Sequence, residues 1–288
     1  MTVKARTRIN QAGRRIVSAS ARNHRIAGEQ HVAGHSKWAN IRHRKERQDK
    51  KKGKIWSKCS KAIMVAARQG GGDPDTNLAL RYAIDEARYA NMPKDTIQRA
   101  VDKGSGAAEG EGFAEITYEG YGPGGVAIII DTLTDNRTRT VNDLRLILGK
   151  GGGSMGNAGS VAFMFETKGR IYIEASKATE EQLMEVALEA GAQDIEAPQA
   201  DGDSDPDEPG YWVITTERTD YHAVRQALER ANIEVSEGGI DKIPTMYAKP
   251  TEEEARKLMN LIDAIEDNDD VQKVYHNLDE DMAAAAAG

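Results

Sequence analysis

The first part of the chain has the apolar spacing of short helices. Its clearest stripe, at intervals that fit one face of a helix, consists of Ile55, Cys59, Ala62, Ile63 and Ala66. Another helical pattern begins at Trp38, a third is capped by Asp75 or Asn77, and a fourth has Pro93 in its first turn. We therefore predict a bundle of four short helices, followed by a linker in the glycine-rich stretch 104–112.

Alternating apolar and polar positions after this linker indicate strands. Residues 116–121 and 126–131 flank a Gly-Pro-Gly-Gly turn at 122–125 and predict a hairpin. A helix is expected from about 140 to 149, and a strand at 160–166 follows it. Together these elements predict a β-β-α-β unit.

Residues 168–243 have the order β-α-β-β-α-β, which is that of a split βαβ, ferredoxin-like module. Its strands are expected at 170–174, near 195, at 211–216 and at 234–236. After this module come a strand at 245–249, a helix around Leu258 and a strand at 271–276. Because these last elements have no complete set of partners, we expect them to return to the sheet begun at 114–166. The ferredoxin-like module is then an insertion.

These patterns predict an α+β protein in which a helical bundle precedes two α+β domains. The predicted segments are a disordered basic extension at 1–31, a helical basic domain at 32–112, a discontinuous α+β domain at 113–167 and 244–279, an inserted ferredoxin-like domain at 168–243, and a disordered tail at 280–288.

Charge is distributed unevenly along the chain, although the formal net charge is only −7. Residues 1–62 hold 18 lysines and arginines against three acidic residues, whereas residues 63–288 hold 21 against 43. A cationic head on an anionic body indicates a polyanionic partner for the head, and nucleic acid is the leading candidate.

Several classes of function are disfavoured by the composition. The single cysteine, Cys59, excludes an intramolecular disulfide framework and favours a reducing compartment, so we expect a cytoplasmic protein. No apolar run is long enough to cross a bilayer, so no membrane partner is expected. His31 and His35 lack a nearby third ligand, and Cys59 lies on an apolar stripe, where a buried thiol is more common than a nucleophile. We predict no metal, no cofactor and no enzymatic activity.

Three glycine-rich stretches, 70–72, 120–125 and 149–156, do not fit the spacing of phosphate-binding loops. Turn and cap glycines explain them better. The stretch 151–156 is more flexible than a connection requires, and it could approach the backbone of a ligand closely.

Two segments are candidates for contact with nucleic acid. In the first, Trp38 and Trp56 add planar groups to a dense basic run. The candidate residues of this run are Lys37, Trp38, Arg42, Arg44, Lys45, Arg47, Lys50, Lys51, Lys52 and Lys54. The second segment, 134–140, precedes a helix, so that its amides, Asn136, Arg137 and Arg139 can face an anion. An ordinary helix cap with solvated arginines explains the second segment equally well.

Long motifs in the first 165 residues resemble the YebC family, also called the YebC/PmpR family of bacterial regulators. They are AGHSKWANIRHRKERQDKKKGKIWSK from residue 33, VAARQGGGDPDTNLALRYAIDEARYANMPKDTIQRAVDKG, ITYEGYGPGGVAIIIDTLTDNRTRT and GGSMGNAGSVAFMF. The resemblance implies a three-domain fold of a helical bundle and two α+β domains, one ferredoxin-like and inserted in the other. The polar residues that match the family motifs are His35, Ser36, Lys37, Trp38, Asn40, His43, Arg44, Lys45, 91–94, Asn136, Arg137 and Arg139.

The chain departs from the family pattern at two places. Family members normally begin at the position of Val32, so that residues 1–31 resemble an addition or a misassigned start. The acidic loop 201–208 is also peculiar to this sequence.

The resemblance implies a regulator of gene expression. Family members are described as probable DNA-binding transcriptional regulators. Others, including a mitochondrial relative that activates translation of a cytochrome oxidase subunit, act on ribosomes and help the synthesis of proline-rich stretches. We therefore expect a cytoplasmic, monomeric, non-enzymatic protein that binds nucleic acid. DNA is the first expected target, and the alternative is ribosomal RNA on the ribosome. The lack of an evident helix-turn-helix slightly favours RNA.

Two rival classes fit the residues less well. A nuclease that uses acidic residues and Mg²⁺ would need a metal-coordinating pattern that the sequence lacks. A scaffold would use the ferredoxin-like module for protein contacts and leave the basic head incidental.

Overall fold

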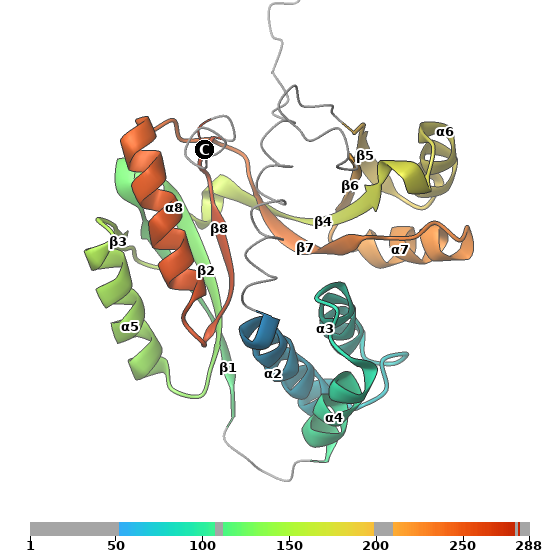
Figure 1. The fold of residues 1–288 in the computed structure, drawn as a ribbon, viewed down its shortest axis with the longest axis horizontal. Coiled ribbons are helices and arrows are strands. Elements are labelled where there is room, and N and C mark those ends of the chain that lie inside the picture. Colours follow the sequence, from blue (N-terminus) through green and yellow to red (C-terminus); the bar gives the residue numbers. More distant parts are fainter. Residues whose placement is uncertain (1–51, 107–111, 199–209, 280–281, 283–288) are drawn as a thin grey trace, which may run out of the picture. The chain divides into compact units, whose positions relative to one another are not determined.

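Three helices open the described part of the chain, which covers residues 52–106, 112–198, 210–279 and 282 of a computed structural model (Figure 1). They are α2 (Lys52–Gly70), α3 (Leu78–Tyr89) and α4 (Lys94–Ser105). Their buried side chains, among them Ile63, Leu80 and Val101, form one core. All described residues belong to a single unit, residues 33–288.

Asn77 fixes the turn between α2 and α3. Its side-chain oxygen accepts a hydrogen bond from Leu80 N, and its amide nitrogen donates to the carbonyls of Ala66 and Gly71. Asn77 is thus the helix cap, as one of the two predicted candidates. Pro93 is the N-cap residue of α4 and therefore precedes the first turn, in which it had been predicted.

The first sheet has the strand order β3-β1-β2-β8, and every neighbouring pair is antiparallel. The strands are β1 (Ala114–Tyr121), β2 (Ala127–Thr134), β3 (Ser154–Met155) and β8 (Val271–His276). Helices α5 (Arg137–Lys150) and α8 (Glu252–Glu266) cover one face, as Figure 1 shows, and their apolar residues share a core with Ile128 and Ile130. The predicted hairpin and the return of the last strand to this sheet are confirmed.

The second sheet has the order β5-β6-β4-β7 and is also antiparallel throughout. Its strands are β4 (Phe165–Glu174), β5 (Ala192–Glu196), β6 (Tyr211–Glu217) and β7 (Glu237–Pro244). The helices are α6 (Glu180–Leu183), which continues as a π-helical turn to Leu188, and α7 (Tyr221–Arg230). They pack on Ile171, Ile173 and Ile214. The predicted β-α-β-β-α-β order is confirmed.

The strand predicted at 160–166 is wrong except for its last two residues. Residues 162–164 form a 3-10 turn, and β4 starts only at Phe165 and runs unbroken to Glu174. The cause is Glu119, whose buried carboxylate accepts hydrogen bonds from the backbone N–H groups of Gly159, Val161 and Ala162 and holds them in a loop.

The strands predicted at 234–236 and 245–249 are also wrong. The strand of this region is β7 at 237–244, which pairs with β4 along eight residues. It ends at Pro244, which lacks a backbone N–H for further pairing. Within 245–249, all of which the structure describes, the β pairing is limited to one isolated bridge from Ala248 to Leu278. Helix α5 also begins three residues earlier than predicted, at Arg137.

Candidate nucleic-acid interface

The thirteen residues predicted to contact nucleic acid fall into two groups. Eight of them, Lys37, Trp38, Arg42, Arg44, Lys45, Arg47, Lys50 and Lys51, lie outside the described residues, as does the helix predicted from Trp38. The other five are Lys52 and Lys54 in the first turn of α2, and Asn136, Arg137 and Arg139 at the start of α5.

Asn136 is the N-cap residue of α5. Its backbone is extended, and its side-chain oxygen accepts a hydrogen bond from Arg139 N at 3.0 Å. Its own N–H donates to Thr134 Oγ1 at 2.9 Å. The cap therefore follows from the sequence Thr-Asp-Asn directly before the helix. Its position puts Arg137 and Arg139 in the first turn, at the positive end of the helix dipole.

Arg139 is held by two carboxylates. Its Nη2 atom donates to Asp135 Oδ1 and to Asp270 Oδ2, both at 2.7 Å. These hydrogen bonds, first of all the one to Asp270, raise the pKa of Arg139. The side chain is still 47% exposed, so the guanidinium keeps a solvent-facing side. Arg139 is positioned by the fold and remains accessible to an anion.

Asp270 is a buried hub beside this helix start. Besides Arg139 it accepts hydrogen bonds from Thr140 Oγ1 at 2.9 Å, Thr134 Oγ1 at 3.2 Å and Lys61 Nζ at 3.3 Å. Burial alone would raise the pKa of this carboxyl, but the hydrogen bonds from Arg139, Thr140 and Lys61 outweigh it and lower the pKa. One carboxylate thus joins α2 to the start of α5.

The lysines of α2 fasten this helix to the C-terminal end of α8. Lys54 donates to the carbonyl of Asp267 at 3.0 Å, and Lys58 donates to that of Glu266 at 2.6 Å. Lys61 donates to the carbonyl of Asp269 at 3.0 Å. The spacing of four and three places all three ammonium groups on one face of α2, opposite the negative end of the α8 dipole. The predicted contact residue Lys54 therefore has an intramolecular partner, although its side chain remains half exposed.

Arg137 differs from Arg139 because its side chain has no ion pair or hydrogen bond to any described residue. It is exposed, and its charge lies near Tyr118. Burial raises the pKa of that phenol, and the charge of Arg137 opposes the rise. Of the predicted residues at the α5 start, Arg137 has the most freedom to meet an external anion.

Trp56 does not act as the free planar group that the sequence suggested. Its Nε1 donates to the carbonyl of Ala90 at 3.0 Å, and its half-buried ring packs on the core of the helices. The indole ties α2 to the residue that caps α3. The available signal for this role was its spacing of three and seven residues from Cys59 and Ile63, which lie on the apolar stripe.

Most glycines of the stretch 149–156 have packing reasons, in agreement with their interpretation as turn and cap residues. A Cβ atom on Gly151 would lie 2.6 Å from Leu261, and one on Gly153 would lie 2.5 Å from the carbonyl oxygen of Tyr121. Gly152 has a φ of +78°, which L side chains rarely adopt. The stretch is therefore shaped mainly by the fold.

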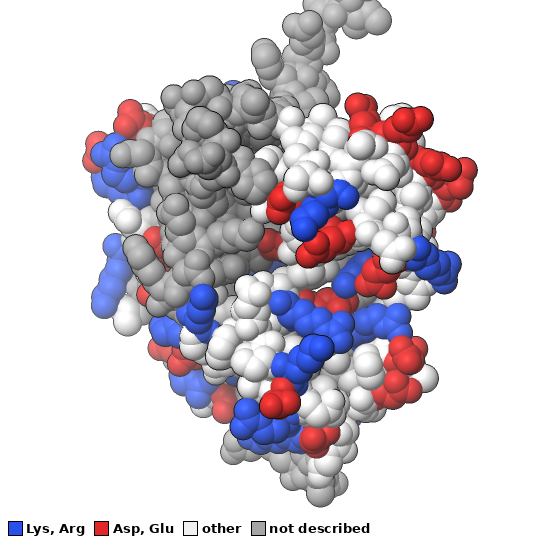
Figure 2. Space-filling view, turned by 45° about the vertical axis from the view of Figure 1, so that its right-hand side comes forward, with Lys and Arg blue, Asp and Glu red and all other residues white. Residues whose placement is uncertain are grey.

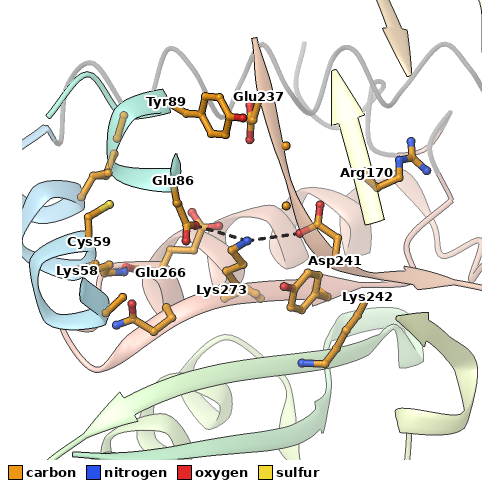
Figure 3. A pocket seen from close by; sticks show the side chains of 18 of the residues that line it. Lys58, Cys59, Glu86, Tyr89, Arg170, Glu237, Asp241, Lys242, Glu266 and Lys273 are labelled. Carbon is orange, nitrogen blue, oxygen red and sulfur yellow. Dashed lines mark hydrogen bonds and ion pairs between the residues drawn. The ribbon is translucent and has the colours of Figure 1, made fainter. Parts of the chain in front are cut away.

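A cavity of about 390 Å³ lies between α2, α3, β7 and β8 (Figure 3). Lys273 projects into it between Glu86, at 3.4 Å, and Asp241, at 3.5 Å. Burial raises the pKa of the Cys59 thiol to about 12, so this group is protonated at neutral pH and is a poor nucleophile. The cavity thus offers paired charges and an inert thiol.

No group of three His, Cys, Asp or Glu side chains suited to a metal ion occurs within the described ranges. In the same ranges, no helix combines the length and the apolar character needed to cross a bilayer. On the face that Figure 2 shows, basic and acidic side chains are interspersed. Ion pairs among the described residues include Arg81 with Asp75 and Arg88 with Asp85.

Known proteins are similar to this chain over nearly its whole length. Residues 36–107 match the family model described as "TACO1/YebC protein N-terminal domain", and residues 113–278 match "TACO1/YebC second and third domain". A "Probable transcriptional regulatory protein" of Rubrobacter xylanophilus is 48% identical over 260 residues, which cover 89% of this chain and 100% of that protein. A "Probable transcriptional regulatory protein CT1665" of Chlorobaculum tepidum is 48% identical and covers 86% of this chain and 95% of its own length.

A solved structure is similar as well. The crystal structure of a conserved hypothetical protein, Aq1575 from Aquifex aeolicus, matches with a TM-score of 0.69 and 39% identity, over 80% of this chain and 91% of that one. The relatives are named as regulators and not as enzymes, which confirms the predicted non-enzymatic class. The family predicted from the motifs is confirmed too: this chain belongs to the TACO1/YebC family.

Proposed function

We propose that this protein is a nucleic-acid-binding regulator of gene expression that acts as a DNA-binding transcriptional regulator. One observation carries the proposal: Asp270 binds both Lys61 of α2 and Arg139 of α5, while the neighbouring Arg137 has no partner among the described residues. The fold thereby brings the helix that continues the basic run next to a positively charged helix start. Two cationic segments far apart in the sequence can then meet one polyanion.

The electrostatic part of this proposal uses residues of both segments. The candidate contacts are Lys37, Trp38, Arg42, Arg44, Lys45, Arg47, Lys50, Lys51, Lys52 and Lys54 of the basic run, together with Asn136, Arg137 and Arg139. Arginine forks suit phosphate oxygens, and the helix dipole of α5 adds to the attraction. The names of the relatives, all "Probable transcriptional regulatory protein", support DNA as the target.

We infer a monomer in the cytoplasm, a helical basic domain at 32–112, a discontinuous α+β domain at 113–167 and 244–279, and an inserted ferredoxin-like domain at 168–243. The strand order β5-β6-β4-β7, together with the pairing of β8 with β2, supports the insertion.

A two-armed experiment tests the target. Lysate is sedimented through a sucrose gradient at low and moderate salt, and chromatin-bound DNA is captured in parallel. The wild-type chain is compared with a variant in which Arg42, Arg44, Lys51 and Lys52 are replaced by glutamate. Recovery from discrete DNA loci, lost in the variant, supports transcriptional regulation. Co-migration with ribosomal particles, lost in the variant, instead supports the alternative of a ribosome-associated translation factor.

A further inference from the structure

The outward face of α5 carries cations that the fold does not neutralise. Arg145 and Lys150 are exposed, and neither side chain has an ion pair with any residue in the described ranges. Helix α8 on the same sheet differs, since Arg256 there pairs with Glu252 at 2.9 Å and Lys257 pairs with Glu253 at 2.7 Å. Unpaired positive charge therefore distinguishes α5 from α8, the other helix on this sheet.

The exposed stripe of α5 has the chemistry of a phosphate contact. Thr138, Asn142, Arg145 and Gly149 follow one another at spacings of four, three and four, and all four are exposed. They offer a hydroxyl, a carboxamide, a guanidinium and bare backbone. The helix contains one carboxylate, Asp143, which lies at the half-buried side. An anionic partner would thus meet little repulsion along the stripe.

Gly149 is a helical glycine for which the fold supplies no packing reason, as is Gly53 in α2. A Cβ atom at this position would meet no atom within 4 Å, although the neighbouring Gly151 and Gly153 are forced by close contacts. The residue lies within α5 and its φ is not in the left-handed region. Glycine weakens a helix relative to alanine, so an exposed helical glycine with free space around it has a cost without an internal benefit. Close approach of an external backbone would supply such a benefit.

We propose that the outward face of α5 is a second contact surface for the sugar-phosphate backbone of the nucleic acid. Arg145 and Lys150 pair with phosphates, Thr138 and Asn142 donate hydrogen bonds to them, and the backbone passes closest to the helix at Gly149. This inference rests on the proposed function and extends its contact from the start of α5 to its end. The 14 residues of α5 span about 21 Å, which matches about six nucleotides of one strand.

Salt titrations of the full chain test the charges. Binding to a fluorescent 30-base-pair duplex, and to a single-stranded RNA of 30 nucleotides, is measured by anisotropy at several salt concentrations. In the double variant Arg145→Gln, Lys150→Gln, affinity falls and the plot of log affinity against log salt becomes shallower by about 1.8 on duplex or about 1.4 on single strands. The matched control, Arg256→Gln with Lys257→Gln on α8, removes the same charge and leaves the slope unchanged.

Gly149→Ala tests whether Gly149 serves binding or the stability of the fold. The substitution raises Tm by roughly 2 °C, because alanine is the better helix former and its methyl group has room. At the same time it weakens binding, because the methyl group keeps the sugar-phosphate backbone away. A stabilised variant that binds worse cannot be explained by damage to the fold.

The outcomes distinguish the two proposals. Suppose that wild-type binding depends on salt. If the double variant then has the same salt slope as its control, or if Gly149→Ala has the affinity of wild type, the α5 surface is refuted and the proposed function stands. If the wild-type chain binds neither probe, the proposed function fails and the inference fails with it.

Discussion

Lys61 Nζ lies 3.3 Å from Asp270 Oδ1, and this ion pair joins residues 209 positions apart in the chain. The same carboxylate holds Arg139 through its other oxygen. A single side chain at the start of β8 therefore sets the position of two helices that carry the candidate nucleic-acid contacts.

Asp270→Asn is expected to destabilise the fold by about 2 kcal/mol, because charge-assisted hydrogen bonds from Lys61 and Arg139 are lost in a buried place. Urea unfolding measures the change. Asp269→Asn is the matched control, since Asp269 is exposed and offers Lys61 its carbonyl oxygen. Equal unfolding midpoints for the two variants would contradict the hub role of Asp270.

Arg137 and Arg139 are expected to respond differently to neutralisation. Arg137→Gln should leave the stability within about 0.5 kcal/mol of wild type, because the side chain is exposed and has no partner in the described part of the chain. It should make the salt dependence of DNA binding shallower by about 0.9. Arg139→Gln should weaken binding and also lower the unfolding midpoint, since it breaks the contacts with Asp135 and Asp270. Anisotropy titrations and urea unfolding give both readouts, and identical behaviour of the two variants would refute this division.

His276 predicts a loss of stability in acid. Burial lowers its pKa to about 4, and its Nδ1 atom is buried without a hydrogen-bond partner. The unfolded chain binds a proton near pH 6.5, whereas the folded chain binds it only near pH 4, so stability falls as the pH decreases between these values. From pH 7 to pH 5 we expect a loss of about 2 kcal/mol from this residue.

His276→Gln should remove that part of the pH dependence, which urea unfolding at pH 7 and pH 5 can detect. His222→Gln serves as a control, because His222 is partly exposed and lies 3.3 Å from Arg81 Nη1. A pH profile that is unchanged in His276→Gln would show that other groups cause the acid sensitivity.

Glu119 is expected to hold the loop before β4. Its carboxylate accepts backbone hydrogen bonds from Gly159 at 2.6 Å, Val161 at 2.7 Å and Ala162 at 2.9 Å. Burial would raise the pKa of this carboxyl, but the backbone hydrogen bonds lower it overall. Its stabilising effect is therefore present at neutral pH and is lost as the pH falls through its lowered pKa.

Glu119→Gln should lower the free energy of unfolding by about 2 kcal/mol and increase hydrogen exchange at the Val161 amide. The glutamine side chain is uncharged and has one acceptor oxygen where the carboxylate has two, so it cannot accept all three hydrogen bonds. Glu115→Gln, at an exposed position of the same strand, is the control. Unchanged exchange at Val161 would contradict the clamp.

The sequence patterns predicted those elements whose local rules agree with the final fold. Strand β1 alternates along most of its length, β2 opens with a run of apolar residues after the Gly-Pro-Gly-Gly turn, and α8 has a regular apolar stripe that includes Leu258. Strand β7 was predicted too early in the chain, at 234–236, because its sequence, EGGIDKIP, has two glycines and no alternation; its position follows from its long pairing with β4.

The candidate site was predictable only in part. Asn136 and the two arginines follow from capping rules, whereas Asp270 stands in the acidic run 266–270, which resembles a solvated surface. Its partners come from α2 and α5, and no local pattern indicates them. The partner of Lys54 could not be predicted either, because its acceptor, the carbonyl oxygen of Asp267, lies 213 positions away.

The contact between α2 and the end of α8 includes three hydrogen bonds from the ammonium groups of Lys54, Lys58 and Lys61 to main-chain oxygens. Those acceptors belong to the backbone of Glu266, Asp267 and Asp269, so they persist whichever side chains occupy these positions. They also do not titrate, so that acid which protonates carboxylates leaves these bonds in place. Replacement of the side chains of Glu266, Asp267 and Asp269 is therefore expected to leave these three anchoring bonds of α2 in place.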